Sequence, residues 1–394
     1  MRAILSVGKR FMPARALAPA VAFLTAFTLA SAAGPLPKAS PGSSTQVQKI
    51  AVFGRDDRQA VPERYDRAAQ AVGILYNDKT RTVCSAFCVS DTIVATAAHC
   101  VAQPTAGRST NATNFVFARN HGRTRDTARV EGFASKSSAQ NIASGDFRMR
   151  VRPPIDAAYD WALVRLSRDI CAKRELAIRV LSLAEIMEEA RANRVYQISY
   201  HRDFAQWKAA YSKPCGVARD FENAEWSAIA PDFLAAERMI LHTCDTGGAS
   251  SGSPLLIDTP EGPAVIGINV GTYVRSKVMM QNGEVARQPR AETVANTAVN
   301  AAAFVSRIET LRSAHVLPSG RPMRDLQERL RQQNFYQGKI DGTFGASLRS
   351  AIEAYEEAKA LPVTGLATPA LLLRLSGESG PSAQAPGQQS ARRR

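Results

Sequence analysis

Short apolar runs separated by Gly, Asn, Asp and Pro dominate the chain from about residue 50 to residue 311. Runs of this length, bounded by turn-forming residues, are typical of β-strands. The clearest cover residues 70–76, 85–96, 115–118, 161–166, 254–257 and 265–270. Residues 183–194 and 301–313 instead have the apolar spacing of helices. The pattern predicts a mainly β core with a few helices.

The apolar period changes after residue 322, beyond a stretch over 313–321 with the composition of a linker. Apolar side chains then recur at helical spacing in three groups: Met323, Leu326 and Leu330; Leu348, Ile352 and Tyr355; Leu371, Leu372 and Leu375. A glycine-rich bridge over 338–345 separates the first two groups and allows tight turns. We expect a small three-helix C-terminal domain over residues 322–376.

The N-terminus has the features of an export signal. Basic residues precede an apolar stretch over 16–30, and Ala30-Ser31-Ala32 fits a cleavage site after Ala32. A membrane anchor is the alternative, but the stretch is shorter than the roughly 20 residues that span a bilayer. We expect a signal peptide over 1–32, a linker or propeptide over 33–49, a disordered tail over 377–394, and no stable membrane span.

Export changes how the six cysteines are interpreted. An even set in an oxidising compartment predicts three disulfides, and many pairings are open from the sequence alone. Zinc is the alternative, but no CxxC or paired-histidine pattern supports it, so we expect no metal and no cofactor.

The formal net charge is +15, without a basic patch interleaved with aromatic residues. Nucleic-acid binding is therefore not expected. Attraction to an anionic cell envelope and a merely solubilising surface both remain open.

Three residues supply the groups that a serine nucleophile needs. His99 ends an apolar segment, Asp160 opens an apolar strand, and Ser251 stands in a glycine-flanked turn. An imidazole accepts the proton of the hydroxyl, and a carboxylate orients the imidazole. Asp146 and Asp156 compete for the orienting role, but neither opens an apolar strand.

The motifs around these residues resemble those of the chymotrypsin-like serine endopeptidases, in particular the bacterial branch with the glutamyl endopeptidases. The matching segments are residues 96–100 (TAAHC), 160–163 (DWAL) and 251–254 (SGSP), with 52–58 (VFGRDDR) similar to the start of the mature enzymes. The resemblance implies a protease domain over 50–312, built from two six-stranded β-barrels with the site between them. It implies an exported enzyme, periplasmic or extracellular, that acts on protein or peptide substrates.

By the same resemblance, the amides of Ser251 and Ala249 form the oxyanion hole, where the family usually has glycine at the second position. Three readings stay open at Ala249. Gly247 and Gly248 take up the strained angles of the turn, or the hole forms only on substrate binding. In the third, the site is inactive, and the domain is a scaffold for envelope binding or partner recognition.

The resemblance places the specificity pocket at Asp245, Thr246, Asn269 and Gly271. Glutamyl endopeptidases carry histidine where Asn269 stands, which puts a preference for glutamate in doubt. Asp245 stands where trypsin-like members keep a carboxylate that favours Arg or Lys. The alternative, which we favour, is that Asp245 binds backbone N–H groups.

The resemblance also implies the disulfides. Cys84 and Cys100 have the family's spacing for a pair that holds the histidine loop. The other expected pairs are Cys215–Cys244 and Cys88–Cys171, with a free Cys88 as the alternative.

The C-terminal domain resembles the peptidoglycan-binding domain of exported bacterial enzymes. The matching segments are residues 334–338 (NFYQG), 340–342 (IDG), 344–345 (FG) and 363–365 (VTG), followed by Thr368. Tyr355 and Glu356 stand where the family has an aromatic residue and glutamine. The resemblance implies peptidoglycan as a partner and a location at the cell wall. The alternative is that these residues only build a small helical domain.

Overall fold

The computed structural model of the chain describes residues 51–101, 115–118, 126–134, 138–150, 152–205, 208–277, 280–281, 284–285 and 290–378. The expected signal peptide, the expected linker or propeptide over 33–49 and nearly all of the expected tail lie outside these residues. In the part of the chain so described, none of the helices is long and apolar enough to cross a bilayer.

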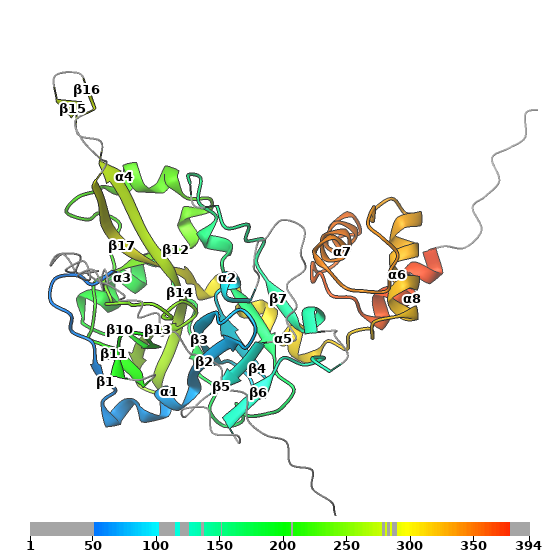
Figure 1. Ribbon diagram of the computed structural model, residues 1–394, viewed down its shortest axis with the longest axis horizontal. Coiled ribbons are helices and arrows are strands. Elements are labelled where there is room, and N and C mark those ends of the chain that lie inside the picture. The colour runs from blue at the N-terminus through cyan, green and yellow to red at the C-terminus, as the bar shows by residue number, and fades with distance from the viewer. Residues whose placement is uncertain are drawn as a thin grey trace, which may run out of the picture. The chain divides into compact units, whose positions relative to one another are not determined.

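Seven antiparallel strands form the first sheet, in the order β6-β5-β2-β3-β4-β8-β7 (Figure 1). Their bounds are β2 Val72–Asn77, β3 Val83–Cys88, β4 Ile93–Thr96, β5 Phe115–Ala118, β6 Thr127–Arg129, β7 Ile142–Ser144 and β8 Ala162–Arg165. A bridge between Val130 and Leu166 joins the ends of β6 and β8, so the sheet curls back on itself.

The second sheet has the order β1-β11-β10-β13-β14-β17-β12, with β9 paired in parallel to β14. The bounds are β1 Gln59–Ala60, β9 Ala177–Ile178, β10 Val195–Tyr200, β11 Ala209–Ser212, β12 Met239–His242, β13 Pro254–Thr259, β14 Gly262–Lys277 and β17 Arg290–Asn300. A separate short pair is formed by β15 Met280–Gln281 and β16 Glu284–Val285.

The two sheets confirm the expected mainly β core, but the expected six strands in each are wrong. The described sheets contain seven and eight strands, and the eight include the two-residue strands β1 and β9. One hydrophobic core joins the sheets: Leu75 and Phe87 of the first pack in the same cluster as Tyr196 and Leu256 of the second. Burial of these large side chains, at about 25 cal/mol per Å² of apolar surface, holds the sheets together.

The helices of this region are α1 Asp66–Ala71, α2 Ala98–Val101, α3 Leu183–Arg191, α4 Trp226–Ile229 and α5 Val305–Ser313. The helix expected over 183–194 begins at a capping box, in which Ser182 and Glu185 bond each other's backbone N–H, and ends at Arg191. The helix expected over 301–313 is a 3-10 turn, Ala301–Ala303, followed by α5.

Three helices form the C-terminal domain, as expected: α6 Arg321–Gln332, α7 Ala346–Ala358 and α8 Pro369–Glu378. The apolar residues singled out in the sequence pack in its core, with Leu372 partly buried. Buried Gln327 accepts the Gly342 amide at 2.9 Å and donates to the Asp341 carboxylate at 3.1 Å. Such bonds give the 340–342 motif a structural role.

Candidate active site

Strand pairing brings His99 and Asp160 together. Strands β4 and β8 are antiparallel with Thr96 opposite Ala162, so the residue three beyond Thr96 meets the residue two before Ala162. The Asp160 carboxylate accepts from the His99 backbone N at 2.8 Å, and its other oxygen lies 2.7 Å from the ring Nδ1. Asp160 is buried and the His99 side chain is 24% exposed. A proton on Nδ1 leaves Nε2 unprotonated, and a base needs this tautomer.

The competing aspartates have other partners. Asp146 forms an exposed ion pair with Arg148. The buried Asp156 carboxylate accepts the backbone N–H groups of Arg148 and Arg150 at 2.6 and 2.8 Å. Of the three carboxylates, only Asp160 bonds the imidazole.

The serine turn packs against the histidine turn. The Ser251 carbonyl accepts from the Ser85 amide at 2.8 Å and lies 3.9 Å from the Cys100 sulfur, one residue beyond His99. Gly252 has φ +85°, and a Cβ there would lie 2.1 Å from the Thr96 hydroxyl and 2.2 Å from the Ser85 carbonyl. Glycine is therefore required at this contact between the two sheets.

The structure has no hydrogen bond between the described side chains of His99 and Ser251. Catalytic hydrogen bonds are often long in enzymes without substrate and tighten in the Michaelis complex. The backbone contacts above hold the Ser251 turn against Ser85 and against Cys100, the residue that follows His99.

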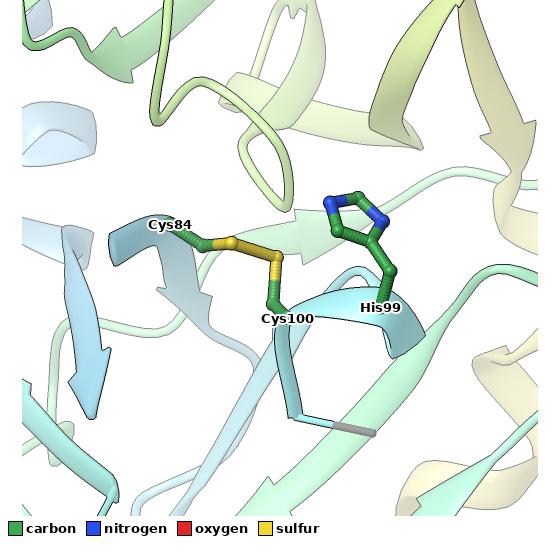
Figure 2. A group of neighbouring side chains, drawn as sticks. All are labelled: Cys84, His99 and Cys100. Carbon is green, nitrogen blue, oxygen red and sulfur yellow. A yellow bond between two sulfur atoms is a disulfide. The ribbon is translucent and has the colours of Figure 1, made fainter. Parts of the chain in front are cut away.

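Figure 2 shows the disulfide that braces the histidine turn. It joins Cys84 of β3 to Cys100 of α2, beside the His99 ring. The other disulfides are Cys88–Cys171 and Cys215–Cys244, so all three pairs agree with the expectation. In each of the two described groups where a histidine meets two cysteines within 4.8 Å, the sulfurs form a disulfide and offer no thiolate to a metal.

The turn around Ser251 contains backbone N–H groups without a hydrogen-bond partner among the described residues, and that of Gly248 is one of them. The amides of Ala249 and Ser251 have no hydrogen-bond partner among the described residues. Ala249 has φ +81°, whereas Gly247 and Gly248 have no positive φ, so the strain expected at the glycines lies at Ala249 itself. The Ala249 carbonyl accepts from the Ser85 hydroxyl at 3.0 Å, which fixes the next peptide plane. Two free amides beside a nucleophile are what an oxyanion hole requires.

Asp245, the first of the expected pocket residues, is fully engaged. Its carboxylate is 2% exposed and accepts the backbone N–H groups of Phe53 and Asp57 at 2.8 and 2.9 Å. These bonds agree with the expectation that Asp245 binds backbone N–H groups and is not a free charge at the floor of a pocket. Gly271 lies on β14 opposite Thr297 of β17.

Thr246 and Asn269, two further residues expected in the pocket, belong to buried polar networks. The Thr246 hydroxyl donates to the Asn296 side chain at 3.2 Å. Asn269 donates to the Ser250 carbonyl at 3.2 Å, and its own oxygen lies 3.2 Å from His242 Nε2. Burial lowers the pKa of His242 to about 4, so its imidazole is neutral and Nε2–H donates to Asn269.

Several residues that support the site could not be predicted from the sequence, among them Ser85, Asn296, His201 and His242. Each lies far along the chain from the group it contacts, and no local motif marks it. The one available signal was polarity: Ser85 lies within an otherwise apolar strand segment.

Two family models match parts of this chain. Residues 84–268 match the family model described as "Trypsin-like peptidase domain", a range that contains His99, Asp160 and Ser251. Residues 319–375 match the family model described as "Putative peptidoglycan binding domain". A solved structure of a Glu endopeptidase in complex with MPD is similar, with a TM-score of 0.43 and 15% identity, covering 67% of this chain and 100% of that one. No curated protein sequence matches significantly.

Proposed function

We propose that this chain, in which a trypsin-like peptidase domain precedes a C-terminal peptidoglycan-binding domain, is an exported serine endopeptidase held at the cell wall. One observation carries the proposal. The His99–Asp160 pair lies against a serine turn whose two amides, at Ala249 and Ser251, are free to bind an oxyanion.

The reaction would proceed through an acyl-enzyme. Ser251 Oγ attacks the scissile carbonyl while His99 Nε2 takes its proton, and Asp160 holds the imidazole and stabilises the imidazolium. The amides of Ala249 and Ser251 bind the oxyanion. His99 then returns the proton to the leaving amine, and a water activated by the same base hydrolyses the ester.

A fluorophosphonate probe tests this assignment. We expect it to label the wild-type protein but neither Ser251→Ala nor His99→Ala. Ser250→Ala is the matched control, because it removes the neighbouring hydroxyl, which is buried, and should still be labelled. Equal labelling of all variants would refute the assigned nucleophile.

The missing hydrogen bond between His99 and Ser251 favours one alternative, a catalytically inactive protease-like scaffold that binds the envelope or a partner. The same probe separates the two functions. Failure to label freshly prepared protein would support the scaffold.

The Asp245 carboxylate already accepts two backbone N–H groups. It therefore gives no support to a preference for cleavage after Arg or Lys. Asn269 likewise provides no cation for glutamate. A random peptide library digested by the enzyme would reveal the residue preceding the cut. A strong preference for Arg or Lys would overturn this view of Asp245.

The C-terminal domain supports attachment to peptidoglycan, and the three disulfides fit an extracytoplasmic location. Co-sedimentation of Ser251→Ala protein with purified peptidoglycan tests the tether, with a chain truncated before residue 319 as control. Because a net charge of +15 favours non-specific adsorption, retention should be compared at low and at high salt. Equal retention of the truncated chain, or no retention of the full one at low salt, would remove the tether.

A further inference from the structure

His201 and Arg202, the two residues that follow β10, form hydrogen bonds with Gly247 and Gly248, which precede the Ala249 and Ser251 amides. The Gly247 amide donates to His201 Nδ1 at 3.0 Å, and the Gly248 carbonyl accepts from the Arg202 amide at 2.8 Å. The Ser250 amide then bonds the Gly247 carbonyl at 3.1 Å, which closes the turn over Ala249. The position of the Gly247 peptide therefore sets the direction of the amides that follow.

His201 is built to accept this bond. Its side chain is buried, at 1% exposure, and Nε2 lies 2.8 Å from the Ser199 hydroxyl. Since an N–H points at Nδ1, that nitrogen has no proton, and the ring proton is on Nε2, which donates to Ser199. One imidazole thus connects the end of β10 to the turn.

The surroundings keep this imidazole neutral. Burial, and next the nearby Arg58 cation, lower the pKa of His201 to about 4, against the opposing carboxylates of Asp203 and Asp56. Arg58 bonds both oxygens of Asp203, at 3.0 and 2.8 Å. The acceptor lone pair on His201 Nδ1 therefore persists at neutral pH.

The turn is also confined from the opposite side. A Cβ on Gly247 would lie 2.4 Å from Asp203 Oδ1 and 2.6 Å from the Arg58 guanidinium. The Gly247 peptide lies between this ion pair and its hydrogen bond to His201, so it has little freedom to rotate.

We propose that His201 is a positioning residue for the oxyanion hole: its Nδ1 fixes the Gly247 peptide so that the turn presents the Ala249 and Ser251 amides to the substrate carbonyl. The proposal rests on the proposed protease function. It adds a residue that directly follows β10, 50 positions before Ser251 in the sequence, and that acts on the transition state without touching it.

The test compares His201→Asn with His201→Leu, two side chains of nearly equal size. Asn places an amide oxygen near the former Nδ1 and can accept the Gly247 N–H, whereas Leu cannot. Loss of one oxyanion donor costs about 100- to 1,000-fold in kcat. For a donor pair that is loosened but present, we expect His201→Leu to lower kcat about 10- to 100-fold, with KM nearly unchanged. His201→Asn should recover most of kcat.

The assays use N-benzyloxycarbonyl-alanine p-nitrophenyl ester as substrate and the matching aldehyde as inhibitor, since its tetrahedral adduct needs the oxyanion hole. The aldehyde should bind His201→Leu more weakly, by the same factor as kcat/KM falls. Tyr65→Phe is the control: it removes the 2.7 Å bond from buried Tyr65 to Asp258, so it should lower the melting temperature and leave kcat intact.

Wild-type kcat and aldehyde affinity in His201→Leu, or equal impairment of the Asn and Leu variants, would overturn the proposal. If His201→Leu does not fold, Ser199→Ala replaces it: losing the partner of Nε2–H weakens the required tautomer, and unchanged kcat there would also contradict the proposal. Absence of fluorophosphonate labelling in wild-type protein would instead refute the protease function, so the two failures are distinguishable.

Discussion

Two buried histidines should make the protease region lose stability as the pH falls from 7 to 5. His201 is 1% exposed and His242 is fully buried. In each, burial is the main cause that lowers the pKa from 6.5 to about 4. In the unfolded chain both imidazoles titrate near 6.5, so the unfolded state takes up protons that the folded state excludes.

The sign and size of the effect follow from this difference in proton uptake. A depressed folded-state pKa gives stability that is complete above pH 6.5 and declines as the pH falls toward 4. Between pH 7 and pH 5, each histidine should cost about 2 kcal/mol of unfolding free energy, so the pair should cost about 4 kcal/mol. The raised pKa of Asp57, caused by burial and then by Asp245, acts in the opposite direction, so variants must be compared with the wild type.

Urea unfolding followed by tryptophan fluorescence measures this loss, in a Ser251→Ala background that prevents self-digestion. All three tryptophans, Trp161, Trp207 and Trp226, precede the C-terminal domain, so the signal reports the protease region. His201→Asn and His242→Gln should each reduce the pH-dependent loss by about 2 kcal/mol, whatever they do to stability at pH 7. A wild-type pH dependence in both variants would refute the claim that these imidazoles are neutral in the folded state.

Three further predictions concern other contacts. Ser85→Ala removes the donor to the Ala249 carbonyl and the acceptor of the Tyr200 amide. Urea unfolding should therefore show a free energy of unfolding lower by about 1–3 kcal/mol, and labelling by the fluorophosphonate probe should slow. Unchanged values in both assays would contradict this role of Ser85. Ala249→Gly removes the strain of a non-glycine residue at φ +81°, a gain of about 1–2 kcal/mol, and adds unfolded-state freedom that costs about 0.4–1 kcal/mol. The free energy of unfolding should therefore rise slightly, and the probe should still label the variant. Abolished labelling would count against the free-amide geometry. In the C-terminal domain, one oxygen of Glu356 accepts the Thr364 and Gly365 amides, and the other accepts the Thr364 hydroxyl. Gln can reproduce these bonds if its amide donates to that hydroxyl, so circular dichroism should show Glu356→Gln melting near the wild type and Glu356→Ala well below it. Equal melting temperatures of the two variants would disprove the network.

Much of the architecture follows from short-range patterns. Apolar runs bounded by turn residues place most strands, and helical spacing in the last third gives the three-helix domain and its core. His99, Asp160 and Ser251 could be named as candidates because each lies in a local context that the predicted chemistry needs, and the structure joins His99 to Asp160. The sequence also distinguished Asp160 from Asp146 and Asp156, since only Asp160 opens the strand that pairs with the histidine strand.

Which residues hold the site in place is determined by the tertiary structure alone. Asp245 bonds Phe53 across 192 positions, and His201 bonds Gly247 across 46, distances over which no residue spacing predicts a contact. The positive φ at Ala249 depends on two hydrogen bonds, from the Ser85 hydroxyl to the Ala249 carbonyl and from the Ser250 amide to the Gly247 carbonyl, and not on the preference of alanine. The physical reason is that a motif reports which groups are close along the chain, whereas strand register and shared burial determine which backbone donors are satisfied and which stay free for a substrate.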